Sequence, residues 1–323
     1  MLKLRRAPKK TKSDTPAPIT ESSSGVLAFS RIRMNPEEQN KVLQAWQTSA
    51  PYWDKYRALI TQMFAPITTG LIEEAQIGVG HNVLDIGGGS GEPSLTISGI
   101  VGPTGSVMYT DPAAGMVESA QAEAGRRGLT NVQFRQCSGD DLPFADGAFD
   151  VAVSRLSAMF FVDPVIGVRE ALRVVRNDGC VSFAVWGAEE ANPFFSTVND
   201  VFDRFVEVST QDPDAPDAFR FAAPGKLAGI LKNAGAEIII ERQLDFKIEA
   251  AMSFEQFWRL RTEMSESLRA KMAGLTPEKI EAIKQAVADA AEEYFPSRKM
   301  NFPAEALIVT GRSTDQRVGE KCG

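Results

Sequence analysis

Between Pro36 and Ala75, apolar side chains recur every three or four residues with polar residues between them. This spacing gathers the apolar side chains on one face of a helix, so it predicts amphipathic helices. Pro51 interrupts the stretch and predicts a break, and therefore at least two helices. The apolar positions are Val42, Leu43, Trp46, Tyr52, Trp53, Tyr56, Leu59, Ile60 and Met63.

Beyond residue 82 the pattern changes to short apolar runs that alternate with helical segments at Met116 to Arg127 and Pro164 to Arg176. Strands that alternate with helices form βαβ units and a parallel sheet covered on both faces. We therefore predict an α/β fold with a doubly wound, mostly parallel sheet and a ligand site at the carboxyl ends of its strands. The predicted strands are Val83 to Ile86, Val107 to Thr110, Val132 to Arg135, Phe149 to Ser154 and Cys180 to Trp186.

Helical periodicity dominates after Gly187, interrupted by two strand-like runs at Glu237 to Arg242 and Ala306 to Thr310. The segment between these two runs is too long for a loop, so we predict a helical lid inserted before the last strand rather than an independent domain. The predicted helices are Pro193 to Val208, Pro224 to Ala234, Phe254 to Met272 and Pro277 to Tyr294.

The first 33 residues combine a basic cluster with Pro, Ser and Thr and hold few large apolar side chains, which predicts a disordered tail. A targeting peptide is the alternative, but Asp14, Glu21 and the lack of an amphipathic apolar face favour a plain tail. We predict five parts: the basic tail at 1–33, N-terminal helices at 34–78, a ligand-binding core at 79–187, a helical lid or substrate region with the last sheet strands at 188–313, and a flexible tail at 314–323.

The chain of 323 residues carries 35 Lys and Arg against 42 Asp and Glu, and its net charge of −7 disfavours binding to nucleic acid. No apolar run reaches the length of about eighteen residues that a membrane span needs, so we expect a cytoplasmic protein without stable membrane insertion. Cys137, Cys180 and Cys322 are too scattered for a disulfide framework or a zinc cluster, and His81 is the one histidine. We therefore expect no metal, and a histidine-based mechanism is disfavoured.

The densest chemical signal is Val83-Leu84-Asp85-Ile86-Gly87-Gly88-Gly89-Ser90-Gly91, an apolar strand that runs through an acidic residue into a glycine-rich turn. Glycines let the backbone turn sharply and let a ligand approach main-chain atoms. The dinucleotide fingerprint G-x-G-x-x-G fails here, because Glu92 stands where the third glycine would follow Gly87 and Gly89. A tight turn with no ligand is the plainer alternative.

The same segment fits D-x-G-x-G-x-G through Asp85, Gly87, Gly89 and Gly91, and with it the chain resembles the class I S-adenosylmethionine-dependent methyltransferases. The resemblance covers about Val83 to Gly187 and implies a Rossmann-like fold with S-adenosyl-L-methionine as the cofactor of the core at 79–187. From Leu142 to Pro164 the chain looks most like the small-molecule branch that includes the quinone C-methylating enzymes, a branch too broad to fix the substrate. The further matching motifs are Thr110-Asp111-Pro112, Leu142-Pro143-Phe144, Phe149-Asp150 and Phe160-Phe161-Val162-Asp163-Pro164.

The resemblance implies roles for individual residues. Asp85 and the glycines would line the methionine end of the cofactor, with the carboxylate holding its ammonium directly or through water. Asp111 would accept hydrogen bonds from both ribose hydroxyls, and it could also cap the following helix. Met116 would pack beside the adenine. Ser154 and Arg155 would contact the methionine part from the other side, with Arg155 pairing with its carboxylate.

The chain departs from the family at Ser138, where relatives commonly carry an aspartate that accepts a bond from the adenine amino group. Three alternatives follow. Ser138 accepts the bond more weakly, Asp140 takes its place, or the backbone of Gly139 and packing hold the adenine.

The aromatic residues can be interpreted in two ways: they could form a lid or the walls of a pocket, or they could pack in the hydrophobic core. Trp53 is our preferred lid over the cofactor, although aromatics at helical spacing are more often core. Asp163 before Pro164 fits a helix N-cap as well as a base. Eight further aromatics could line an apolar substrate pocket or simply pack: Phe160, Phe161, Phe194, Phe195, Phe219, Phe221, Phe257 and Trp258.

The implied reaction is methyl transfer to carbon, oxygen or nitrogen of a small, apolar or aromatic acceptor. Positioning alone can carry much of such catalysis, and the sequence identifies no catalytic base. The alternatives are a non-catalytic cofactor-binding or regulatory protein that keeps the fold and, behind it, a nicotinamide oxidoreductase. The acidic balance favours a small acceptor over RNA or protein, and the oligomeric state is not predicted.

Overall fold

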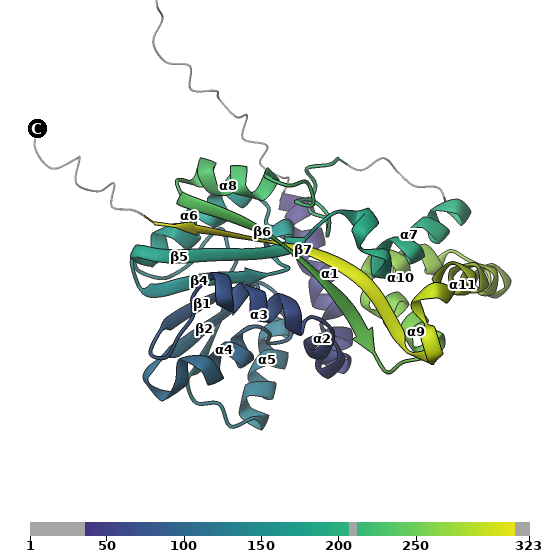
Figure 1. Cartoon of the computed structure of the whole chain (residues 1–323), viewed down its shortest axis with the longest axis horizontal. Helices are drawn as coiled ribbons and strands as arrows, with labels where there is room; N and C mark the ends of the chain where they lie inside the picture. Colours follow the sequence, from purple (N-terminus) through teal and green to yellow (C-terminus); the bar gives the residue numbers. More distant parts are fainter. Residues whose placement is uncertain (1–35, 207–211, 314–323) are drawn as a thin grey trace, which may run out of the picture. The chain divides into compact units, whose positions relative to one another are not determined.

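The computed structural model describes residues 36–206 and 212–313 (Figure 1). Its centre is a seven-stranded sheet in the order β3-β2-β1-β4-β5-β7-β6, which confirms the predicted doubly wound α/β fold. Strands β1 to β5 are parallel, and β7 runs antiparallel to both β5 and β6. The strands are β1 (Asn82–Ile86), β2 (Ser106–Asp111), β3 (Val132–Gln136), β4 (Phe149–Arg155), β5 (Val175–Trp186), β6 (Glu237–Ala250) and β7 (Met300–Arg312).

The strand order reverses between β1 and β4. From β1 the chain steps outward to β2 and β3, whereas from β4 it steps the other way to β5. Right-handed crossovers therefore put the connecting helices of the two halves on opposite faces, and a crevice opens at the carboxyl ends where the order reverses. The helices of these connections are α4 (Ser94–Val101), α5 (Ala114–Arg126) and α6 (Pro164–Val174), and α8 (Lys226–Ala234) packs on α6 and β6.

Three helices precede the sheet: α1 (Pro36–Lys55), α2 (Arg57–Met63) and α3 (Ala65–Glu74). The predicted break at Pro51 is wrong, because Pro51 lies inside α1 and the first break comes at Tyr56. Proline has no N–H to donate to the carbonyl four residues earlier. Because Pro51 is exposed, water can bond to that carbonyl instead, and side-chain packing before and after the proline holds the helix. The Trp46 and Trp53 rings lie 5.9 Å apart across the proline.

The region after β5 is helical apart from β6 and β7, as predicted. Its helices are α7 (Pro193–Phe205), α9 (Phe254–Met264), α10 (Glu266–Ala273) and α11 (Pro277–Ala291), and Figure 1 shows them gathered around the far ends of β6 and β7. The single predicted helix from Phe254 to Met272 divides at Ser265, whose hydroxyl accepts from Leu268 N and caps α10. Short 3-10 turns are Gly102–Thr104, Ala158–Phe160, Glu189–Ala191, Glu292–Tyr294 and Pro296–Arg298.

All seven strands are longer than predicted, and β5, β6 and β7 are longer by five residues or more. β5 begins at Val175, where α6 ends, so the helix predicted to reach Arg176 is two residues too long. β6 and β7 pair from Glu237 with Arg312 to Ala250 with Met300, and the outer pair of Ile248 with Phe302 is fully buried. The two long strands thus carry the helical insertion on a continuation of the sheet.

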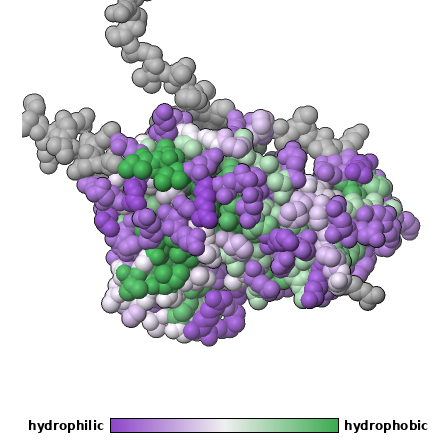
Figure 2. Space-filling view, viewed as in Figure 1, coloured by the Kyte–Doolittle hydropathy of each residue, from purple (hydrophilic) through white to green (hydrophobic). Residues whose placement is uncertain are grey.

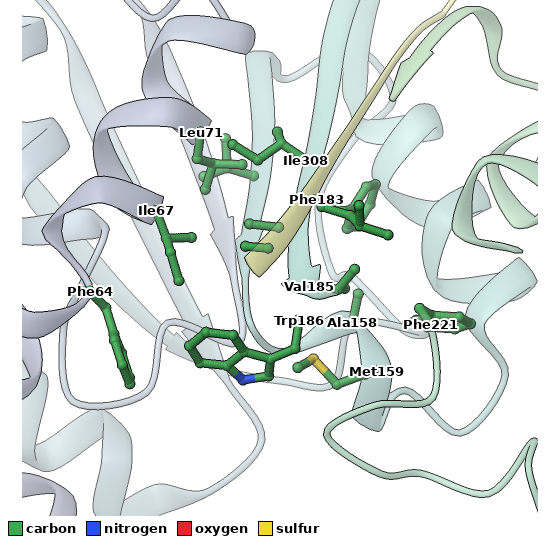
Figure 3. Close-up of a cluster of buried hydrophobic side chains, with 14 of the residues drawn as sticks. Phe64, Ile67, Leu71, Ala158, Met159, Phe183, Val185, Trp186, Phe221 and Ile308 are labelled. Carbon is green, nitrogen blue, oxygen red and sulfur yellow. The ribbon is translucent and has the colours of Figure 1, made fainter. Parts of the chain in front are cut away.

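The core joins the sheet to the N-terminal helices. Figure 3 shows the Trp186 indole at the end of β5 between Phe64 and Met159, with Ile67 and Leu71 of α3 beside Ile308 of β7. Burial of this apolar area is the main favourable term in folding. The predicted tails at 1–33 and 314–323 lie outside the described residues. Within the described residues, no helix is both long enough and apolar enough to cross a lipid bilayer.

Candidate functional site

A cavity of 440 Å³ opens at the carboxyl ends of β1, β2 and β4, at the crevice that the strand order predicts. Its volume falls in the range typical of small-molecule sites, about 300 to 1,000 Å³. Nine of the twelve predicted site residues line it, and they come from five separate parts of the chain. They are Trp53, Gly87, Gly89, Asp111, Met116, Ser138, Gly139, Asp140 and Arg155.

The glycine loop after β1 forms one wall. The amides of Gly87 and Gly88 both donate to the carbonyl of Thr110 at 2.9 Å, which fixes the loop against the end of β2. Gly87 has a φ of +71°, and a Cβ there would collide with the Ser157 hydroxyl. Gly89 has a φ of +55°, and no atom of the described residues lies within 4 Å of its would-be Cβ, so its Cα faces open space at the cavity wall.

Asp111 connects the end of β2 to this loop. Its Oδ2 accepts from the Gly89 amide at 3.1 Å and its Oδ1 accepts from the Ala113 amide at 2.9 Å, just before α5. Because a carboxylate has about four acceptor positions, each oxygen can take a further bond from a ligand hydroxyl. Burial raises the pKa of Asp111 to about 6, and the two backbone donors oppose that rise.

Arg155, at the end of β4, lies on the cavity wall. Its Nη1 donates to Thr68 Oγ1 at 2.8 Å, and its buried Nε has no hydrogen-bond partner among the residues that the structure describes. Burial lowers the pKa of Arg155, while the negative charges of Glu92 and Asp85 act in the opposite direction. Glu92 also lines the cavity; among the described residues its buried Oε1 accepts no hydrogen bond, but it lies 3.5 Å from Arg127 Nη1 in an ion pair. Within the described part of the chain, this end of the cavity therefore holds a carboxylate oxygen that accepts no hydrogen bond and an arginine N–H that donates none.

Aromatic rings line another part of the cavity. Trp46 of α1 lies 5.9 Å from Trp53 and 4.9 Å from Phe160, centroid to centroid. The buried indole N–H of Trp53 has no hydrogen-bond partner in residues 36–206 and 212–313. Phe64 and Phe161 complete the aromatic lining.

The remaining wall is formed by the loop after β3. Ser138, Gly139 and Asp140 all line the cavity, together with Asp141 and Pro112. A Cβ at Gly139 would come within 2.9 Å of Ile86 and 3.0 Å of Phe161, so the chain packs closely there. Both Ser138 and Asp140 are within the wall, so the alternatives for the adenine contact stay open.

Comparison with known proteins matches residues 84–183 to the family described as "Methyltransferase domain". Over 207 residues the chain is 31% identical to the nocamycin O-methyltransferase of Saccharothrix syringae, and the match covers 60% of this chain and 73% of that protein. The chain belongs to the class I S-adenosylmethionine-dependent methyltransferases. The ubiquinone/menaquinone biosynthesis C-methyltransferase of Hahella chejuensis is 30% identical over 186 residues, covering 57% of this chain and 74% of that protein.

The fold agrees with this membership. The solved YcgJ protein of Bacillus subtilis superposes with a TM-score of 0.51 at 21% identity, covering 77% of this methyltransferase and 98% of that chain. Some curated relatives are matched over less of their length. The chain is 32% identical over 155 residues to uncharacterized proteins of Mycobacterium bovis and Mycobacterium tuberculosis. The match covers 48% of this chain and 55% of those proteins.

The cofactor of this family is S-adenosyl-L-methionine, and the cavity of this methyltransferase fits it. The amino-acid end of the cofactor carries an ammonium and a carboxylate. Facing it, the wall offers the Glu92 carboxylate, whose Oε1 accepts no hydrogen bond from the described residues, and Arg155 Nε, which donates none to them. A ribose needs hydroxyl acceptors, which the oxygens of Asp111 provide. The open face of Gly89 lets the ligand approach the loop.

Three predicted site residues lie off the cavity wall. Asp85 is fully buried behind the glycine loop, and its Oδ2 accepts from Ser94 N at 3.2 Å and Ser94 Oγ at 2.7 Å. Gly91 packs against Leu95, and Ser154 is fully buried. Their contacts with the cofactor stay predictions, and for Asp85 the unpartnered Oδ1 leaves an acceptor available.

The structure also adds residues that the sequence analysis did not place in the site. Trp46 stands seven residues before Trp53, a spacing that puts both on one helix face, so periodicity could have found it. Glu92 appears in the sequence analysis only as the residue that breaks the dinucleotide fingerprint, and nothing there indicates that it lines the cavity.

Asp163 is a helix cap. It caps α6, accepting from Val165 N and Ile166 N at 3.0 Å. Of the eight aromatics considered for a substrate pocket, only Phe160 and Phe161 line the cavity.

Asp85→Asn is expected to stabilise the ligand-free protein. Burial raises the pKa of Asp85 from 3.8 to about 7, so the folded state prefers the protonated form and loses stability as the pH rises from about 4 to about 7. Asparagine keeps an oxygen for Ser94 and removes the charge. We expect a gain in unfolding free energy of roughly 1 to 3 kcal/mol at neutral pH and above, with weaker cofactor binding.

Thermal unfolding of both proteins between about pH 5 and pH 8 measures this difference. The gap in melting temperature is expected to widen as the pH rises. An Asp85→Asn protein that is less stable than wild type at pH 8 would contradict the assigned burial cost.

Proposed function

We propose that this methyltransferase transfers a methyl group from S-adenosyl-L-methionine to carbon, oxygen or nitrogen of a small apolar or aromatic acceptor. The observation that carries the proposal is the division of one cavity between charged and aromatic walls. One part of the wall offers hydrogen-bonding groups, from Asp111, Glu92 and Arg155. The other part offers apolar surface, from the rings of Trp46, Trp53, Phe64 and Phe160. The names of the nocamycin and ubiquinone/menaquinone relatives, an O- and a C-methyltransferase of small molecules, support it.

When bound, S-adenosyl-L-methionine supplies an activated methyl group on a sulfonium. Asp111 and the glycine loop would fix the nucleoside, and Arg155 with Glu92 would fix the amino-acid end. The aromatic wall excludes water and offers flat surface to a ring. Holding the acceptor atom in line with the methyl carbon can lower the barrier by roughly 7 to 11 kcal/mol, so no dedicated base is required.

The organisation of the chain supports further parts of the proposal. We assign residues 79–187 to cofactor binding and keep residues 188–313 as a helical lid or substrate region, of which no described residue lines this cavity. The net charge of −7 favours a small acceptor over nucleic acid, and the scattered cysteines favour the cytoplasm.

Transfer of labelled methyl from S-adenosyl-L-methionine to a panel of phenols, quinols and aryl amines tests this function. Wild type is expected to label at least one member, and the Gly89→Val variant none. Tight cofactor binding with no labelled product from any class would instead favour the non-catalytic regulatory protein.

A further inference from the structure

Arg57, the first residue of α2, is a buried arginine that joins the N-terminal helices to the glycine loop. The residue is 7% exposed, and its Nε donates to the carbonyl of Ser90 at 2.9 Å. Ser90 stands between Gly89 and Gly91 and lines the cofactor cavity. Arg57 itself is not among the described residues of the cavity wall, so it holds the loop from behind.

The rest of the guanidinium reaches α5 and the end of α1. Nη1 donates to Glu123 Oε2 at 3.0 Å, and Nη2 donates to the carbonyl of Ser119 at 3.0 Å. Nη2 also donates to the Asp54 carboxylate and to the Ser119 hydroxyl. Because the guanidinium carries five N–H donors in one rigid plane, it holds all these acceptors in a fixed arrangement. One side chain therefore fixes the loop relative to both helices.

The buried carboxylate of Glu123 extends this network to a second residue of the cavity wall. Its Oε1 accepts from Arg127 Nε at 2.6 Å. Arg127 Nη1 in turn lies 3.5 Å from Glu92 Oε1 in an ion pair. Glu92 lines the cavity two residues after Ser90, so both residues are held from the side away from the cavity by one connected set of charged groups.

We propose that Arg57 is a positioning residue, which fixes Ser90 and Glu92 in the arrangement that receives S-adenosyl-L-methionine. Glycines at positive φ flank Ser90, and such a backbone samples many conformations unless contacts restrict it. Conformational freedom that a ligand must remove weakens its binding, so a loop fixed in advance binds more tightly. The proposal rests on the proposed function, because it takes this cavity as the site of the methyl donor.

Three variants separate the bond to the loop from the rest of the network. In Arg57→Lys a methylene replaces Nε, so the bond to Ser90 is lost, while the ammonium can still pair with Glu123. Arg57→Met removes both interactions. The matched control is Arg269→Met, because Arg269 of α10 donates to Ser49 Oγ of α1 at 2.8 Å but is not among the described residues of the cavity wall.

Calorimetry with S-adenosylhomocysteine and thermal unfolding of the full chain test the role of Arg57. Arg57→Lys is expected to bind S-adenosylhomocysteine about tenfold more weakly than wild type, with a melting temperature close to that of wild type. Arg57→Met should lose affinity to the same extent and also melt at a lower temperature. Arg269→Met should keep wild-type affinity even if its melting temperature falls.

A residue that only stabilises the fold would change affinity and melting temperature together. Losses of affinity that follow the melting temperature through all three variants therefore overturn the positioning role, and so does wild-type affinity in Arg57→Lys. An equal loss in Arg269→Met overturns it as well, since any loosening of α1 would then explain the effect. Failure of wild type to bind S-adenosylhomocysteine would instead overturn the proposed function, and this role with it.

Discussion

Gly89→Val is expected to weaken S-adenosylhomocysteine binding by more than about a hundredfold while the protein stays folded. Gly89 lines the cavity with a φ of +55°, and nothing in the described part of the chain lies within 4 Å of its would-be Cβ. A valine side chain would therefore project into the cavity space that the cofactor needs. Loss of about 3 kcal/mol of binding free energy corresponds to this factor.

Two effects of Gly89→Val must be distinguished: the backbone strain of a side chain at a positive φ, and the steric exclusion of the cofactor by that side chain. Gly128 offers a matched control, because it has a φ of +66°, has no described residue within 4 Å of its would-be Cβ and is not part of the cavity wall. Gly128→Val should pay a similar backbone cost and bind S-adenosylhomocysteine like wild type. If the two variants lose affinity equally, the loss comes from the backbone and the loop does not receive the cofactor.

Asp111→Asn is expected to weaken S-adenosylhomocysteine binding by about a hundredfold and to remove its dependence on pH near 6. Charge-assisted hydrogen bonds contribute about 1.5 to 3 kcal/mol each, and the ribose would donate two to this carboxylate. Since burial raises the pKa of Asp111 to about 6, the ionised acceptor is lost as the pH falls through that value. Wild-type affinity should therefore decrease on acidification.

Asp163→Asn is the control for this change, because Asp163 is a helix cap off the cavity wall and asparagine caps equally well. Affinities from calorimetry between about pH 5 and pH 8 provide the comparison. Wild-type binding that is flat over this range, or an Asp111→Asn protein with wild-type affinity, would show that the ribose is held elsewhere.

The parts of the fold that depend on local pattern were predictable. Short apolar runs between helices are set by side-chain periodicity, so the order of strands and helices followed from the sequence. The continuation of β6 was missed, although Leu244, Phe246 and Ile248 alternate with polar residues in the manner of a strand. Pro51 was misread, because packing of Trp46 and Trp53 outweighs a local helix breaker.

The cofactor site was predictable where backbone chemistry demands a residue type. Gly87 and Gly89 have positive φ, which favours glycine, and Asp111 accepts a hydrogen bond from the glycine loop. These requirements restrict the residue type, so the sequence motif could identify all three. Glu92 carries no such signature. Its place in the cavity wall depends on how distant parts of the chain pack, and sequence spacing does not report that.

The most direct test of the central claim is calorimetric titration of the full chain with S-adenosyl-L-methionine and S-adenosylhomocysteine, with NAD as control. The cavity beside the glycine loop predicts saturable one-to-one binding of both sulfur compounds and none of NAD. A folded sample that binds NAD, or binds neither methionine compound, would contradict the assignment of this cavity to the methyl donor.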